Sequence, residues 1–184
     1  EDYLSAFKTL APLADYIAIN ISSPNTPGLR SLQEKEPLTD LLNVIRKYKK
    51  DENIRTPVFI KIAPDLTFHQ IDDVLQVIYD TGCTGIIATN TTIERNDIAA
   101  NEIEISGREN GGLSGRPLTQ RSLDIVRFIS NSTQQKLPLI GVGGLMTPDD
   151  IKARIDAGAW LVQLYTGLIY SGPEILRDSL RMLD

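Results

Sequence analysis

Leu139-Ile140-Gly141-Val142-Gly143-Gly144 decides the fold, together with the later stretch Leu161-Val162-Gln163-Leu164-Tyr165-Thr166-Gly167. Each begins as an apolar run rich in β-branched residues, which is typical of a buried strand, and each ends in glycine or hydroxyl residues. Neither ending is a P-loop or a dinucleotide-binding fingerprint. Two successive units of this kind are typical of the phosphate-binding loops that follow strands seven and eight of a (β/α)8 barrel.

Earlier apolar runs have the same character, and together they predict five strands. These are Tyr16–Ile21, Val58–Ile62, Gly85–Ala88, Leu139–Val142 and Leu161–Leu164. The stretches between them contain apolar residues at helical spacing. One such face is Leu38, Leu41, Leu42 and Ile45, and another is Ile71, Val74, Leu75 and Ile78. Alternating strands and helices predict a parallel sheet of the α/β class.

Helix starts are also marked in the sequence. Thr67 and Gln70 have the spacing of a capping box, and Thr147-Pro148 is typical of an N-cap followed by the first helical residue. A charge-free stretch, residues 157–173, is interrupted by glycines and polar residues, and we interpret it as a strand plus a loop rather than as a membrane span.

Five βα units fit either a doubly wound sheet of the flavodoxin type or the later part of an eight-stranded βα barrel. The two polar strand endings favour the barrel, as does a helical segment, Tyr3–Leu13, before the first strand. A barrel needs roughly 250 residues. We therefore expect residues 1–184 to form a partial barrel domain, strands four to eight, with the first three strands absent and the active site incomplete.

Composition excludes several classes of function. With 41% hydrophobic and 23% charged residues, the sequence is that of an ordinary globular protein, and its net charge of −5 argues against a nucleic-acid partner. A single cysteine, Cys83, excludes an internal disulfide and a cysteine-based metal cluster, and we expect it to be a small buried filler. A single histidine excludes a site with several histidines, so no metal is predicted.

Two strands are followed by clusters of amide and hydroxyl side chains. The first run leads into Asn20-Ile21-Ser22-Ser23-Pro24-Asn25-Thr26, where Pro24 restricts the loop, and the third ends in Thr89-Asn90-Thr91-Thr92. About twenty-five residues without clear periodicity then follow, containing Gly111-Gly112-Leu113-Ser114-Gly115. Segments of this length are often lids or binding loops, and glycines allow a close approach of the backbone to a ligand.

Lys61 interrupts the apolar run of the second strand. An unpaired ammonium in a barrel interior is costly, so we expect Lys61 to face an anionic group. Two alternatives remain open, namely a lysine on the outer face that reaches solvent and a Schiff-base lysine of the barrel aldolases.

These features together resemble dihydroorotate dehydrogenase, the flavin enzyme of pyrimidine biosynthesis, and the resemblance spans essentially the whole chain. The segments that carry it are Asn20–Arg30, Lys61–Leu66, Thr89–Thr92, Gly111–Leu118, Leu139–Gly144 and Leu161–Thr166. The resemblance implies oxidation of dihydroorotate to orotate, with FMN as the cofactor.

The resemblance also implies roles for individual residues. Ser23 corresponds to the base that removes the C5 proton of dihydroorotate while the C6 hydride passes to the flavin. The substrate-binding positions implied are Asn20, Asn25, Asn90 and Thr91. Those implied for FMN are Asn20, Lys61, Thr89, Gly115, Gly144, Tyr165 and Thr166. Lysine suits this role because it stabilises negative charge on a reduced flavin, and glycine amides suit a phosphate.

The family has two classes, and class 1 enzymes carry cysteine at the position of Ser23. The serine found here implies class 2, which passes electrons to a membrane quinone. That class carries an N-terminal helical extension that meets the membrane. We therefore expect a peripheral membrane protein, on the cytoplasmic face of a bacterial inner membrane or on the mitochondrial inner membrane. The alternatives are a soluble class 1 dehydrogenase, a Schiff-base aldolase that uses Lys61, and a half-barrel without activity on its own.

Overall fold

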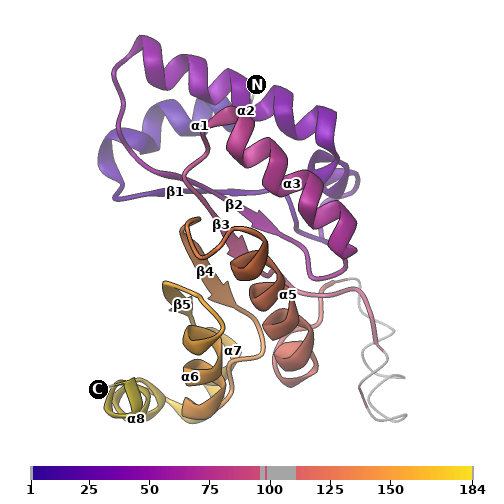
Figure 1. Ribbon diagram of the computed structural model, residues 1–184, viewed down its shortest axis with the longest axis vertical. Coiled ribbons are helices and arrows are strands. Elements are labelled where there is room, and N and C mark those ends of the chain that lie inside the picture. Colours follow the sequence, from indigo (N-terminus) through magenta and orange to yellow (C-terminus); the bar gives the residue numbers. More distant parts are fainter. Residues whose placement is uncertain (1, 96–97, 99–110, 184) are drawn as a thin grey trace.

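Five parallel strands form one sheet in the order β1-β2-β3-β4-β5 in a computed structural model that describes residues 2–95, 98 and 111–183 (Figure 1). The strands are β1 (Ile17–Asn20), β2 (Val58–Ile62), β3 (Gly85–Ala88), β4 (Leu139–Val142) and β5 (Leu161–Gln163). All five predicted strands are thus confirmed to within a residue at each end. The peptide bond between Ala88 and Thr89 is cis.

Helices follow the strands in alternation. The longer ones are α1 (Asp2–Leu10), α2 (Lys35–Asp51), α3 (Phe68–Thr81), α5 (Thr119–Ser132), α6 (Pro148–Asp156), α7 (Thr166–Ser171) and α8 (Glu174–Leu183). Short 3-10 turns are η1 (Ala11–Leu13), η2 (Leu29–Gln33) and η3 (Arg116–Leu118). Both predicted helix starts are confirmed, because Thr67 and Thr147 each accept a hydrogen bond from the backbone N–H three residues later.

The strand order decides between the two predicted architectures. Each strand pairs in parallel with the next one along the chain, as in a βα barrel, whereas the flavodoxin type places its second strand at the sheet edge. The barrel prediction is therefore confirmed. The register aligns the carboxyl ends, since Asn20 lies opposite Lys61 and Val142 opposite Gln163. The loops after all five strands consequently meet at one edge.

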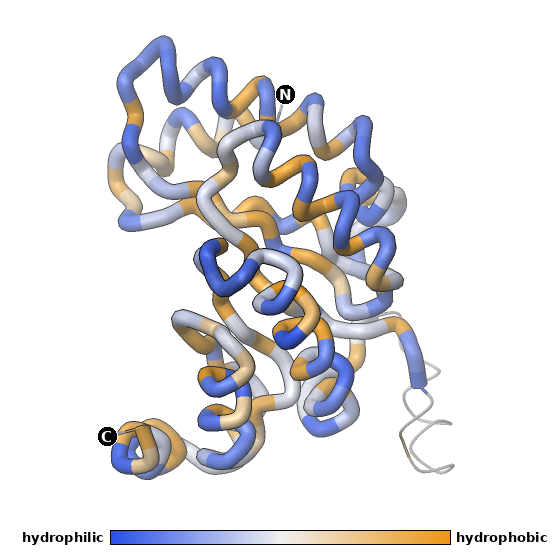
Figure 2. Tube along the Cα trace, in the orientation of Figure 1, coloured by the Kyte–Doolittle hydropathy of each residue, from blue (hydrophilic) through white to orange (hydrophobic). Residues whose placement is uncertain are grey.

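The sheet has a helix-covered face and an inner face. Ile60, Ile62 and their neighbours on other strands pack against α2, α3 and α5, forming the main core. Phe59, Ile87 and Ile140 form a separate cluster on the other face. Figure 2 shows the hydrophobic strands between amphipathic helices. Because side chains alternate along a strand, Lys61 shares the inner face with Phe59, and the alternative that places Lys61 on the outer face is wrong.

Three expectations need correction or completion. Residues 166–171 form the short helix α7 where we expected loop. Glycine is required at position 167 of this helix, because a Cβ there would lie 2.0 Å from Leu145 O. Cys83 is half buried rather than fully buried. The proposed lid reaches beyond the described residues, although Gly111–Gly115 lies within them. Among the described helices, none is long and apolar enough to span a membrane.

Candidate functional site

A cavity of about 510 Å³ opens at the carboxyl ends of β2 to β5. Most of the residues predicted to bind flavin or substrate line this cavity: Lys61, Thr89, Asn90, Thr91, Gly115, Gly144, Tyr165 and Thr166. The sequence did not single out Ser114, Leu118, Val142, Gln163 and Leu164, which also line it. The volume is typical of a small-molecule or cofactor site.

Of the residues that line the cavity, Lys61 most clearly needs a ligand that carries negative charge or accepts hydrogen bonds. Its side chain leaves the inner face of β2, is half buried, and has no hydrogen-bond or ion-pair partner among the described residues. Burial lowers the pKa of the Lys61 ammonium below its ordinary value. An anionic or strongly accepting ligand in the cavity would offset this loss of hydration.

Asn20 and Asn90 lie together although they are seventy residues apart. The Oδ1 atom of Asn20 accepts hydrogen bonds from Asn90 Nδ2 at 3.0 Å and from Ser22 Oγ at 2.9 Å. The Oδ1 atom of Asn90 accepts from the backbone N–H of Thr91 at 2.8 Å. Ser22, which is fully buried and which the sequence did not single out, therefore helps to fix the orientation of both amides.

Ser23 and Asn25 do not line the cavity but belong to the adjoining β1 loop. Ser23 Oγ accepts a hydrogen bond from the backbone N–H of Asn25 at 3.2 Å. The loop is covered by Gly112, where a Cβ would lie 1.8 Å from Thr91 Oγ1 and 2.9 Å from Pro24 Cγ. Glycine is thus required for the described part of the predicted lid to lie against the serine loop.

Arg30 and Asp65 join three of the loops and were not predicted as site residues. Their ion pair measures 2.8 Å between Nη1 and Oδ2, and both side chains are largely buried. Arg30 also donates to the carbonyl oxygens of Ser22 and Thr91, each at 3.1 Å. Asp65 in turn accepts a hydrogen bond from Thr92 Oγ1. This network fixes the relative positions of the loops that follow β1, β2 and β3.

A glycine turn follows β4, with φ of 101° at Gly143 and 71° at Gly144. Its carbonyl groups are held from behind: Ser122 Oγ lies 2.7 Å from Gly143 O, and Thr119 Oγ1 donates to Gly144 O at 2.6 Å. The amide N–H of Gly144 has no partner among the described residues, whereas that of Gly143 faces β5, where Val142 pairs with Gln163. An unpaired amide beside a cavity is suited to bind an anion.

The loop after β5 completes the cavity wall. Thr166 Oγ1 donates to Ser114 Oγ at 3.0 Å, and a Cβ on Gly115 would lie 3.0 Å from Thr166 Cγ2. The described end of the predicted lid is therefore in contact with the residues after β5. Tyr165 is 75% exposed.

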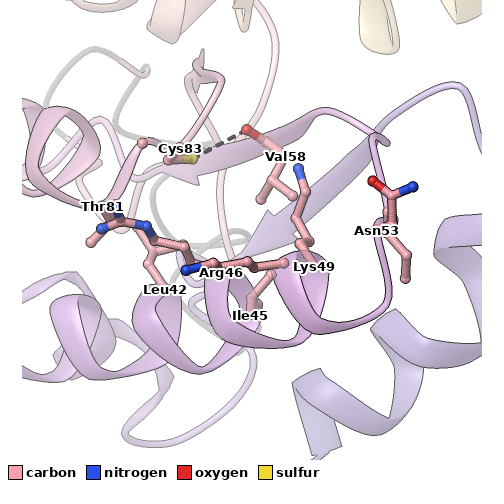
Figure 3. Close-up of a pocket in the computed structure, with 11 residues that line it drawn as sticks. Leu42, Ile45, Arg46, Lys49, Asn53, Val58, Thr81 and Cys83 are labelled. Carbon is pink, nitrogen blue, oxygen red and sulfur yellow. Dashed lines mark hydrogen bonds between the residues drawn. The ribbon is translucent and has the colours of Figure 1, made fainter.

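A second cavity, of about 380 Å³, lies at the opposite, amino ends of β2 and β3 (Figure 3). Its half-buried polar side chains are already paired with the backbone, since Lys49 Nζ donates to Thr56 O at 2.6 Å and Cys83 Sγ donates to Val58 O at 3.1 Å. Burial raises the pKa of the Cys83 thiol to about 11, so it is an unreactive neutral group. Within the described ranges, no three His, Cys, Asp or Glu side chains are grouped to hold a metal ion.

Comparisons with known proteins identify the family of this chain. The family model described as "Dihydroorotate dehydrogenase" matches residues 1–184. A relative from Christiangramia forsetii, named "Dihydroorotate dehydrogenase (quinone)", is 47% identical over 178 residues, which are 97% of this chain and 51% of the relative. A relative of the same name from Thermosynechococcus vestitus is 49% identical over 187 residues, 100% of this chain and 50% of the relative.

Two solved structures from Eimeria tenella have the same fold. The crystal structure of DHODH in complex with ferulenol has a TM-score of 0.91 at 36% identity, covering 99% of this chain and 52% of that one. The ligand-free structure has a TM-score of 0.87 at 36% identity, covering 97% and 53%. The chain spans about half the length of the curated relatives it matches. The family predicted from the sequence is confirmed, and the chain belongs to the dihydroorotate dehydrogenase family.

Proposed function

We propose that the protein containing this chain oxidises dihydroorotate to orotate in pyrimidine biosynthesis, with FMN as cofactor and a membrane quinone as electron acceptor. The observation that carries the proposal is the half-buried, unpartnered ammonium of Lys61 in the cavity at the carboxyl ends of the strands. Beside it lie an amide cluster around Asn90 and the glycine turn at Gly144. The Lys61 ammonium suits a flavin ring, the amide cluster suits a pyrimidine substrate, and the glycine turn suits a phosphate.

The described residues fit FMN. Lys61 offers a positive charge to the pyrimidine edge of the isoalloxazine ring, and the free amide of Gly144 offers a donor to the phosphate. The hydroxyl of Thr166, which here donates to Ser114 Oγ, would redirect its hydrogen to the phosphate. Gly115, Thr89 and Tyr165, which line the cavity, are proposed as further contacts. Asn20 does not line the cavity but is also proposed, because it bonds to Asn90, which does. FMN, when bound, would supply the acceptor for the substrate hydride.

Asn20, Asn25, Asn90 and Thr91 are proposed to bind dihydroorotate. Amides donate and accept at once, which matches the alternating N–H and C=O groups of the pyrimidine ring. Asn90 is already oriented by its bonds to Asn20 and to the Thr91 backbone. Little side-chain entropy is therefore lost when the substrate binds, which favours binding and correct orientation.

Ser23 is proposed to remove the C5 proton of dihydroorotate. The hydrogen bond that its Oγ accepts from the Asn25 N–H favours the deprotonated oxygen over the neutral hydroxyl. Nevertheless, no described side chain accepts the Ser23 proton, so a water or a group outside the described residues has to relay it.

Replacing Ser23 tests the proposal directly in the full-length protein. We expect Ser23→Ala to retain FMN but to lose roughly 10²-fold or more in the rate at which dihydroorotate bleaches the flavin under anaerobic conditions. Ser31→Ala, an exposed serine of the same loop, should leave the rate unchanged. Ser23→Cys should restore activity with a pH profile displaced toward the thiol pKa. Normal bleaching by Ser23→Ala would remove Ser23 from the mechanism.

Quinone use is proposed because the relatives from Christiangramia forsetii and Thermosynechococcus vestitus carry that acceptor in their names, and because position 23 is a serine. Contact with the membrane would come from an N-terminal segment outside these 184 residues, at a bacterial inner membrane or the mitochondrial inner membrane. Quinone-dependent reoxidation of the reduced, full-length protein in lipid vesicles tests this part. Reoxidation only by a soluble acceptor would favour the class 1 alternative.

A further inference from the structure

A buried arginine lies directly behind the glycine turn, on the side away from the cavity. Arg154 belongs to α6 and is 1% exposed. Its Nη2 lies 3.1 Å from Gly143 O and 3.4 Å from Thr119 O. Its Nε and Nη1 are buried without a hydrogen-bond partner among the described residues.

The packing around Arg154 is specific to this side chain. A Cβ on Gly141 of β4 would lie 2.5 Å from Arg154 Cγ and 3.0 Å from Cδ, so glycine is needed where the aliphatic stem crosses the strand. The stem thus runs along the helix-covered face of β4 toward the carboxyl end. The guanidinium therefore lies on the carbonyl side of the Gly143–Gly144 turn.

Arg154 has no ion-pair partner in the described part of the chain. Asp150, one turn earlier on α6, instead accepts hydrogen bonds from the backbone N–H groups of Met146 and Thr147. Burial lowers the pKa of the Arg154 guanidinium to about 10, and at neutral pH the group remains charged. The Asp150 carboxylate acts on this charge without forming an ion pair with it, and burial still dominates. The buried charge is therefore only partly balanced, next to the turn that borders the cavity.

We infer that Arg154 is a positioning residue for the phosphate of FMN, acting through the Gly143–Gly144 turn. It holds the carbonyl side of the turn, together with Ser122 and Thr119, so that the amide of Gly144 remains free for the ligand. The phosphate on the other side of the turn adds to the partial balance that Asp150 provides. This inference rests on the proposed function, because it takes FMN as the ligand of the cavity.

Comparing FMN with riboflavin, which lacks the phosphate, isolates this role. Dissociation constants of both flavins are measured by fluorescence titration of the full-length apoprotein. We expect Arg154→Met to weaken FMN binding at least tenfold and to leave riboflavin binding within twofold. Arg154→Lys, which keeps the charge, should retain most of the FMN affinity. Lys152→Met removes an exposed charge from the same helix, α6, and should change neither constant.

The outcomes separate this inference from the proposed function. Equal weakening of FMN and riboflavin in Arg154→Met would mean a packing role only and would overturn the inference, as would unchanged FMN binding. If Arg154→Met does not fold, Arg154→Gln serves the same comparison, because it also removes the charge. A wild-type protein that binds neither flavin would overturn the proposed function itself, before any variant is compared.

Discussion

Lys61 and Lys49 are half-buried lysines at opposite ends of β2, and burial lowers the pKa of both. Lys49, at the amino end, donates to Thr56 O at 2.6 Å and faces a cavity whose half-buried polar side chains bond to the backbone. Lys61, at the carboxyl end, has no described partner and lines the same cavity as Gly144, whose amide N–H is unpaired among the described residues. The two cavities therefore differ mainly in the state of their lysines. The protein itself provides a hydrogen-bond partner for Lys49, but none of the described residues provides one for Lys61.

This difference supports the proposal that the carboxyl-end cavity is the binding site. A buried polar group that is paired within the protein contributes to the stability of the fold. A buried polar group without a partner destabilises the ligand-free protein, so a ligand that pairs with it binds more favourably. The amino-end cavity contains two more cationic side chains, Arg46 and Lys50, yet Arg46 also bonds to a backbone carbonyl, that of Asp80. Cavity volume and charge alone would not have distinguished the two ends.

The largest contrast is expected between Gly144, at the carboxyl-end cavity, and Gly82, at the amino-end cavity. Both have positive φ, of 71° and 67°. Gly82→Ala meets open space and should cost about 1 kcal/mol of unfolding free energy from strain alone. Gly144→Ala would place its Cβ 2.2 Å from Thr119 N, so we expect a loss of more than about 3 kcal/mol. Denaturant titration of the full-length variants measures both, and similar losses would contradict the contrast.

A second contrast concerns the two lysines themselves. Lys61→Met should weaken FMN binding about tenfold or more without destabilising the apoprotein, since it removes an unpaired buried charge. Lys49→Met should leave FMN binding unchanged and lose about 1 kcal/mol of stability with its hydrogen bond. Flavin titration and denaturation of the same samples give both quantities. If Lys49→Met lowered FMN affinity as much as Lys61→Met, the division between the two ends would fail.

The smallest effect is expected at Cys83. Because its pKa is raised to about 11, iodoacetamide should modify the folded protein slowly at pH 8, with a half-maximal rate near pH 11. An unfolded thiol has a pKa of about 8.5. The stability from the buried neutral thiol is therefore present below that pH and is lost as the pH rises toward 11. Cys83→Ala should not alter FMN affinity. Rapid modification at pH 8 would show that the amino end opens.

Much of the fold could be predicted from local sequence. Strand positions followed from short apolar runs, and helix starts followed from Thr67 with Gln70 and from Thr147 with Pro148. The helix α7 was missed, and the close approach of its Gly167 to Leu145 is a tertiary contact without a local signal. Among the residues of the carboxyl-end cavity, Lys61 stood out because a lysine within an apolar run is unusual.

The supporting residues could not be predicted because they act on backbone atoms far away in sequence. Arg30 pairs with Asp65 and bonds to Thr91 O, and Arg154 lies against Gly143 O. Arginines of this kind look like ordinary surface charges until the fold is known. Gly141 was a usable signal, since glycine within a strand often marks a close approach by another group. Gly141 therefore indicated that some group lies against the strand, but not that this group is Arg154.

The consecutive order of the strands has a consequence for how the sheet assembles. Every strand hydrogen-bonds to the strand that leaves the ribosome immediately before or after it. Each βα unit can therefore join an existing edge as it is synthesised, without waiting for a distant segment. Each strand pairing therefore closes a loop of only one βα unit, so each step has a small entropic cost. Because paired strands are close in sequence, the contact order is low for a parallel sheet.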